Sequence, residues 1–138
     1  MLDNYRDLID ELLEAPTVVR GALDRSQDAE SVSALVALLT DRDQALTKRL
    51  RRVMDHPDDL VDHFPVAPVD QSQGTAAAFD TARGELVSLL MNLTLKDWAR
   101  PVRFASGGES DVAEEVEAHV EFGETMLERI VVAASGNS

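Results

Sequence analysis

Two residues of this 138-residue chain combine a reactive side chain with a place on an otherwise apolar helical stripe. His119 lies in the stretch 110–134, one helical turn beyond Val116 and one turn before Gly123. In a helix its ring would therefore face the core, where a buried imidazole needs a hydrogen-bonding partner. Asp43 interrupts a second stripe in the same way, between two leucines. The two side chains could meet if their helices face one another.

A carboxylate beside a histidine fixes the imidazole tautomer and raises the histidine pKa, which is how a general base is oriented. The simpler interpretation is a hydrogen bond that satisfies two core residues, or a position at the half-exposed rim of the core. We adopt the simpler interpretation, so His119→Ala is expected to change stability more than any activity. Catalytic residues are not assigned, and His119 and Asp43 remain the candidates.

Four stretches with apolar residues at helical spacing must position these side chains: residues 3–25, 31–54, 75–95 and 110–134. Pro16 interrupts the first stretch, but the apolar phase continues through it, which indicates one kinked helix or two nearly collinear ones. Asp28 or Ser31 could cap the second helix, and Ser110 the fourth.

The connections between these helices differ in length. Residues 55–74 contain three prolines and many acids, which indicates a long connection across one end of the helices, either a crossover or a functional flap. Residues 96–109 are too rich in Gly and Pro for a helix, and the tail 135–138 is expected to fray. The sequence thus predicts an all-α, up-and-down four-helix bundle that forms a single domain over residues 1–138.

Charge and composition exclude several functions. The chain carries 26 acidic and 13 basic residues, a net charge of −13, which disfavours nucleic-acid binding. The basic run 48–52 is expected to form a solvated helix face. There is no cysteine, which excludes disulfides and thiolate metal sites. No signal peptide or membrane-spanning run is recognisable, so we expect no membrane partner and a cytoplasmic location.

Four stretches of the chain together resemble the DinB/YfiT-like superfamily of four-helix bundles. They are ELLEAPTVVRGALD at 11–24, SVSALVALLTDRDQALTKRLRRVM at 31–54, ARGELVSLLMNLTLKDWARPVRF at 82–104 and GESDVAEEVEAHVEFGETMLERI at 108–130. The resemblance covers most of the chain and implies a bundle whose members typically hold one divalent metal through three histidines. It also implies pairing of two copies through helices.

The histidines that the resemblance implies are not in place. The second-helix ligand corresponds to Leu38, and the two ligands of the last helix correspond to Phe122 and Met126. An alternative alignment would make them His119 and Gly123 instead. These side chains cannot supply a converging donor set, so we expect a degenerate metal site and no cofactor.

Two alternatives to this interpretation use other polar residues. A divalent metal such as zinc or nickel could bind at a site rebuilt from His119 and Asp43 with Glu115 or Glu85. His56 and His63, among the acids of the long connection, could bind a cation loosely. A loop lacks the surrounding side chains that hold metal ligands in place, so we expect them to be part of a solvated loop.

Three function classes follow. The first, which we favour, is a non-catalytic protein that binds a small ligand or a partner. The second is a metal-dependent transferase or isomerase that uses a low-molecular-weight thiol, at the rebuilt site around His119 and Asp43. The third is a self-association module. Homodimerisation is expected in every case, and the sequence does not identify the ligand.

Overall fold

Four long helices form most of the described protein. The computed structural model describes residues 2–26, 28–64 and 70–136. The long helices are α1 (Leu2–Arg25), α2 (Ala29–Asp55), α3 (Ala76–Met91) and α5 (Val112–Ala134). The prediction of a predominantly helical protein is confirmed, and α1 continues through Pro16 as one helix. None of the helices that the structure describes is long and apolar enough to cross a membrane.

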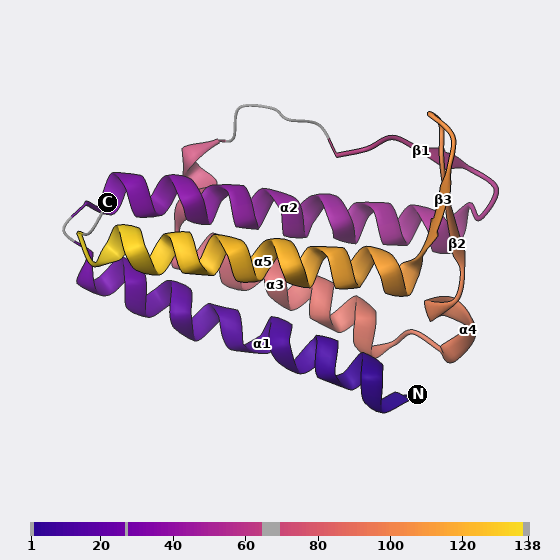
Figure 1. The fold of residues 1–138 in the computed structure, drawn as a ribbon, viewed down its shortest axis with the longest axis horizontal. Coiled ribbons are helices and arrows are strands. Elements are labelled where there is room, and N and C mark those ends of the chain that lie inside the picture. The colour runs from indigo at the N-terminus through magenta and orange to yellow at the C-terminus, as the bar shows by residue number, and fades with distance from the viewer. Residues whose placement is uncertain (1, 27, 65–69, 137–138) are drawn as a thin grey trace.

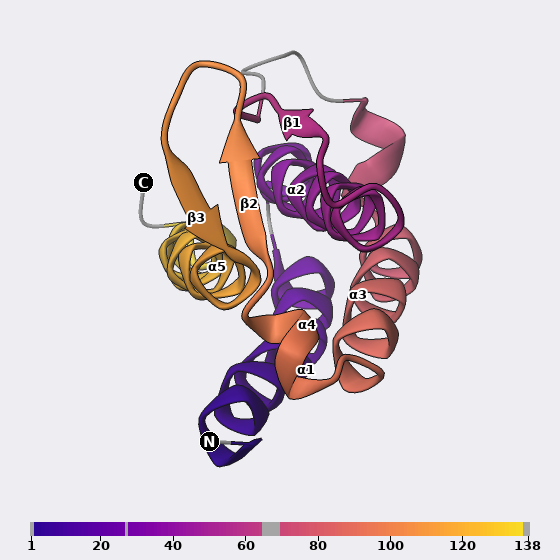
Figure 2. The ribbon, with the colours of Figure 1, turned by 90° about the vertical axis from the view of Figure 1, so that its right-hand side faces the viewer.

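The helices run in an order that the sequence did not predict. Figure 1 shows that α2 and α3 point in the same direction, as do α1 and α5, and that the two pairs are antiparallel to each other. The prediction of an up-and-down order is therefore wrong. Viewed along their axes, α1 and α2 lie at opposite corners, with α3 and α5 between them (Figure 2). Each long helix thus has two others as its main neighbours.

The connection between α2 and α3 runs back along the helices and not across one end, because α3 begins near the start of α2 (Figure 1). It contains the strand β1 (Leu60–Val61) and the 3-10 helix η1 (Gln71–Gly74). A Cβ atom on Gly74 would lie 2.2 Å from the backbone oxygen of Ser33, so only glycine permits this close packing of η1 on α2. The crossover prediction was correct in kind, but the predicted path was wrong.

The second connection is more ordered than the sequence suggested. It contains the short helix α4 (Leu95–Trp98) and the strands β2 (Pro101–Phe104) and β3 (Glu109–Asp111). β2 lies between β1, which is parallel to it, and β3, which is antiparallel. This sheet covers the end of the helices where α5 begins (Figures 1 and 2). The all-α prediction therefore missed three short strands and one turn of helix.

Capping side chains explain where the predicted helix ends shift. Thr94 and Asp97 form a reciprocal capping box that starts α4, so the predicted third helix stops earlier, at Met91. Asp111 caps α5 by accepting a hydrogen bond from the backbone N–H of Glu114 at 2.8 Å, in place of the predicted Ser110. Asp28, one of the two predicted candidates, caps α2. Ser110 instead belongs to β3.

The apolar core is divided into two clusters. One surrounds Leu46, Leu86 and Trp98, at the end of the helices that carries the sheet. The other surrounds Leu39, Phe79 and Ile130, toward the opposite end. Both are made of side chains at helical spacing, as the sequence indicated. The boundary between them is occupied by polar residues, which form the candidate site.

Candidate functional site

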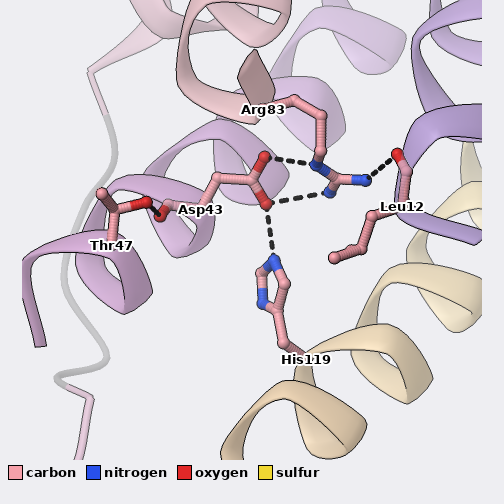
Figure 3. Close-up of polar contacts among 5 residues, drawn as sticks. All are labelled: Leu12, Asp43, Thr47, Arg83 and His119. Atoms are coloured by element: carbon pink, nitrogen blue, oxygen red, sulfur yellow. Dashed lines mark hydrogen bonds and ion pairs between the residues drawn. The ribbon is translucent and has the colours of Figure 1, made fainter. Parts of the chain in front are cut away.

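The predicted candidates His119 and Asp43 meet inside the protein, together with Arg83 (Figure 3). His119 Nε2 lies 2.6 Å from Asp43 Oδ1. Arg83 donates from Nε to Asp43 Oδ2 at 2.7 Å and from Nη2 to Asp43 Oδ1 at 2.9 Å. Asp43 and His119 have no exposed surface, and Arg83 is 3% exposed. We call Arg83, Asp43 and His119 the buried triad.

A fourth contact ties the buried triad to α1. Arg83 Nη1 donates to the backbone carbonyl of Leu12 at 2.8 Å. In a regular helix that carbonyl accepts from the N–H four residues later, but residue 16 is a proline, which has no N–H. Arg83 therefore supplies the donor that Pro16 cannot. Through this bond the triad connects all four long helices.

The buried triad lies between the two apolar clusters. On α2, Asp43 stands between Leu39 of one cluster and Leu46 of the other. On α3, Arg83 stands between Phe79 and Leu86 in the same way. The triad is therefore a polar layer across the core, held by side chains from three helices and by the Leu12 carbonyl of the fourth.

The carboxylate of Asp43 is held in its ionised form. Burial alone would raise its pKa, but hydrogen bonds from His119 and Arg83 and the charge of the guanidinium outweigh burial, so the pKa of Asp43 lies below its ordinary value. Two parallel N–H donors on one carboxylate are the bidentate geometry that arginine favours. Arg83 and Asp43 thus form a neutral pair.

His119 is a neutral imidazole in this arrangement. Because Asp43 is ionised, Nε2 must carry the proton and donate it, which leaves Nδ1 unprotonated. Nδ1 is buried and has no hydrogen-bond partner in the described structure. Burial lowers the pKa of His119, and this effect exceeds the raising effect of Asp43. Asp43 thus raises this pKa, as expected, but burial, together with the charges of Arg83 and Arg42, makes the net shift downward.

The positions that correspond to the family's metal ligands do not form a site. Leu38 is 38% exposed on the outer side of α2, and it does not belong to either apolar cluster. Phe122 is partly buried against the second cluster, and Met126 is part of that cluster. None of the three offers a nitrogen or oxygen donor in the interior. The described side chains therefore do not fit the divalent metal that the resemblance implies.

The residues of the alternative metal site bind other side chains or are exposed at the surface. Glu115 Oε1 accepts a hydrogen bond from Arg49 Nη1 at 2.6 Å, and Glu85 is exposed. Both oxygens of Asp43 accept from the positively charged Arg83. Among the described residues no group of three or more His, Cys, Asp or Glu side chains could hold a metal ion.

A second polar cluster holds the long connection and β2 against α2 and α5. Arg49 of α2 is 9% exposed, so the prediction that the basic run 48–52 forms a solvated face is wrong at this residue. Its guanidinium lies 3.7 Å from the ring centre of Phe64 and 5.5 Å from that of Phe104. The guanidinium of Arg42 lies 4.5 Å from the ring centre of Phe64 and 4.7 Å from that of Phe122. We call these alternating rings and guanidinium groups the arginine–aromatic stack.

The histidines of the long connection have different surroundings. His63 is exposed, but its ring stacks on Phe104 with centres 4.4 Å apart, and Nε2 lies 3.2 Å from the hydroxyl of Ser106. It therefore extends the arginine–aromatic stack and does not stand in a purely solvated loop. His56 is exposed and follows the end of α2.

Arg83 and Arg49 were not among the site residues predicted from the sequence. Arg83 follows Phe79 by one turn and precedes Leu86, so its place on an apolar stripe was visible. Long cationic side chains often reach solvent from such positions, and this makes the signal weaker than for an aspartate or a histidine. Pro16 was a second signal, because a proline inside a helix frees a carbonyl for a donor from elsewhere.

A hollow lies outside the buried triad, between α1 and α3. It has a volume of about 580 Å³, and Leu13, Pro16, Val87 and Met91 are among its walls. Arg83 also lines it, so the guanidinium connects this hollow with the polar layer. A volume of this size falls in the range of small-molecule pockets.

No family model, curated protein or solved structure matches this chain.

Proposed function

We propose that this chain is a non-catalytic binding protein on a DinB/YfiT-like four-helix bundle, in which an arginine and not a metal neutralises the interior carboxylate. Members of the family that the sequence resembles typically hold one divalent cation through three histidines. In this chain the guanidinium of Arg83 compensates Asp43. The binding role, for a small ligand or a partner, would belong to the outer faces of the helices. We also propose a cytoplasmic location and a homodimer.

The observation that carries this proposal is that Asp43 is fully hydrogen-bonded and that the triad is almost completely buried. Both carboxylate oxygens accept hydrogen bonds, and the side chains of the triad are 0–4% exposed. A general base must reach the proton that it abstracts, within about 3.2 Å or through one water. A substrate outside the helices cannot approach His119 so closely without displacing core side chains. The triad is therefore better suited to stability than to catalysis.

The proposal is tested by metal analysis of protein purified without a histidine tag. We expect less than stoichiometric zinc, nickel, iron or manganese, and an unfolding temperature that does not change with a chelator. Stoichiometric metal that the chelator removes, with a lower unfolding temperature afterwards, would overturn the proposal. It would favour the alternative, a metal- and thiol-dependent transferase or isomerase around His119 and Asp43.

A thermal-shift screen tests the binding role separately. Small acids, amines and low-molecular-weight thiols are added to the metal-free protein, since any ligand that prefers the folded state raises the unfolding temperature. The matched variant is Met91→Ala, which alters a wall of the hollow between α1 and α3 without touching the triad. A ligand that stabilises both proteins equally binds elsewhere on the chain.

A further inference from the structure

We propose that the hollow between α1 and α3 binds a small, uncharged and largely apolar molecule that carries one hydroxyl or primary amide group. The hollow has a volume of about 580 Å³, and both helices line it, with Pro16 on the α1 side and Gly84 on the α3 side. This inference rests on the proposed binding role and names the site and the chemical class of the ligand.

Most of the wall of this hollow is apolar. Leu13 and Pro16 of α1 line it together with Val87 and Met91 of α3. Met91 is 67% exposed and Leu13 is 51% exposed, so both present apolar surface that a ligand would remove from water. Removal of apolar surface from water is a major source of affinity in pockets of this kind. The body of the ligand is therefore apolar.

Gly84 adds room to the hollow. It lies within α3, and a Cβ atom at this position would meet nothing within 4 Å. The space above this glycine is therefore open, and it belongs to the hollow because Gly84 is one of the lining residues. A larger side chain at this position would occupy that space and leave less of it for a ligand.

The polar residues at one end of the hollow include an acceptor without a donor. Arg20 of α1 pairs with Oδ2 of Asp80. Oδ1 of Asp80 is buried and has no hydrogen-bond partner in the described structure. Buried polar atoms in proteins nearly always have a partner. A hydroxyl or amide group of a ligand would supply the missing donor, and its oxygen would accept from Arg20, whose described contact uses only Nη2.

The polar residues at the other end of the hollow are already paired with each other. Asn92 Nδ2 donates to the backbone carbonyl of Ser88 at 2.7 Å, so this amide group has its partner within the same part of α3. The polar group of the ligand therefore belongs beside Asp80. Its apolar body would then extend over Gly84 toward Met91.

The charges around the hollow favour an uncharged ligand. The charged residues that line it are Arg20, Asp80 and Arg83. Asp80 balances Arg20, and Asp43 balances Arg83, so no net charge is left for a ligand to neutralise. An ammonium group at Asp80 would lie beside the guanidinium of Arg20. A carboxylate would meet Asp80 and the net charge of −13. Either ion would leave water without full pairing, which is unfavourable.

A titration of the metal-free full chain with four matched probes tests the chemistry of the ligand. The probes are phenethyl alcohol, its methyl ether, phenylacetate and phenethylamine, each added up to millimolar concentrations. Affinity is measured from the NMR shifts of backbone amide signals, including that of Gly84, and is checked by the rise in unfolding temperature. We expect the alcohol to bind at least tenfold more tightly than the other three. It is the only one of the four that is uncharged and also has a donor for Asp80.

Substitutions of two helical glycines test the location of the site. Gly84→Leu fills the hollow and should weaken binding of the alcohol at least tenfold, and Gly84→Ala should weaken it less. Neither should lower the unfolding temperature, because both residues form helices better than glycine and the new Cβ meets no neighbour. Gly21→Leu is the matched control on α1, where the Cβ would meet only the end of the Arg25 side chain. It lies outside the hollow and should bind the alcohol as the wild type does.

Several outcomes would overturn the inference. They are no binding of the alcohol at millimolar concentrations, binding of either ion or of the ether as tight as that of the alcohol, and binding that the substitutions at Gly84 leave unchanged. A loss in Gly21→Leu as large as that in Gly84→Leu would also overturn it. None of these results bears on the metal content, and stoichiometric metal would overturn the proposed function instead. The two failures are therefore distinguishable.

Discussion

Replacing Arg83 by methionine removes the positive charge of the polar layer and nearly preserves side-chain length. Asp43 would then be a buried carboxylate with no cation beside it, and the Leu12 carbonyl would lose its donor. Breaking a buried ion pair on one side costs about 3–5 kcal/mol. A domain of this size is stable by about 5–15 kcal/mol. We therefore expect Arg83→Met to remove a large share of the free energy of unfolding at neutral pH.

The pH dependence of this loss gives a sharper expectation. Without Arg83, the pair of Asp43 and His119 lowers its energy by taking up one proton, on the carboxylate or on the imidazole. The folded variant then binds a proton that the folded wild type does not bind. Its deficit in stability should shrink as the pH falls, by up to about 1.4 kcal/mol per pH unit for one proton.

Urea unfolding followed by circular dichroism, at several pH values, measures both effects. Arg52→Met is the matched control, because Arg52 pairs with Asp59 at the surface, where the two side chains are 53% and 45% exposed. This control should change stability by less than about 1 kcal/mol. The double variant Asp43→Asn with Arg83→Met should be more stable than Arg83→Met alone, since no charge remains unpaired. A loss below about 1 kcal/mol for Arg83→Met at neutral pH would refute the reasoning.

Three further substitutions test other parts of the structure by the same unfolding measurement. The pKa of His119 is lowered from 6.5, so the unfolded chain takes up a proton below that pH while the folded protein does not, and stability falls toward acid. In His119→Gln this loss below pH 6.5 should be shallower by up to about 1.4 kcal/mol per pH unit, and an unchanged slope would contradict it. Pro16→Ala should stabilise by less than the ~3 kcal/mol usual for a helix interior, because the Leu12 carbonyl already has a donor; a gain of the full amount would count against that bond. Arg49→Met should lower the free energy of unfolding by about 3 kcal/mol, because it leaves the largely buried carboxylate of Glu115 without its ion-pair partner. A near-zero effect would indicate that this ion pair is solvated.

Polar residues on apolar stripes were the most informative part of the sequence. Asp43 and His119 were found in this way, and the structure brings them together. Their environment was predicted less well, because the pKa of His119 is lowered mainly by burial, to which several helices contribute, and by the charges of Arg83 and Arg42. Periodicity describes one helix at a time and does not say which stripes converge.

Neither the direction of the helices nor the presence of the sheet could be predicted from the sequence, for different reasons. A 20-residue connection is long enough to cross one end of the helices or to run back along them, so residues 55–74 did not fix the direction of α3. β1 has only two residues, Leu60 and Val61, and its pairing with β2 joins segments about 40 residues apart. So short a strand leaves no recognisable alternation.

The division of the core by the polar layer limits how the helices can slide along one another. Apolar side chains that recur every three or four residues would still be buried after a shift of one turn, about 5.4 Å. A shift of α5 by that distance would bring Gly123 or Glu115 to Asp43 in place of the imidazole. With Gly123 there, Asp43 would lose the hydrogen bond from His119, and with Glu115 there, two carboxylates would lie side by side in the interior. An all-apolar replacement of the layer should therefore keep the stability of the fold but allow several alignments, which would appear as broadened or doubled NMR signals from core methyl groups.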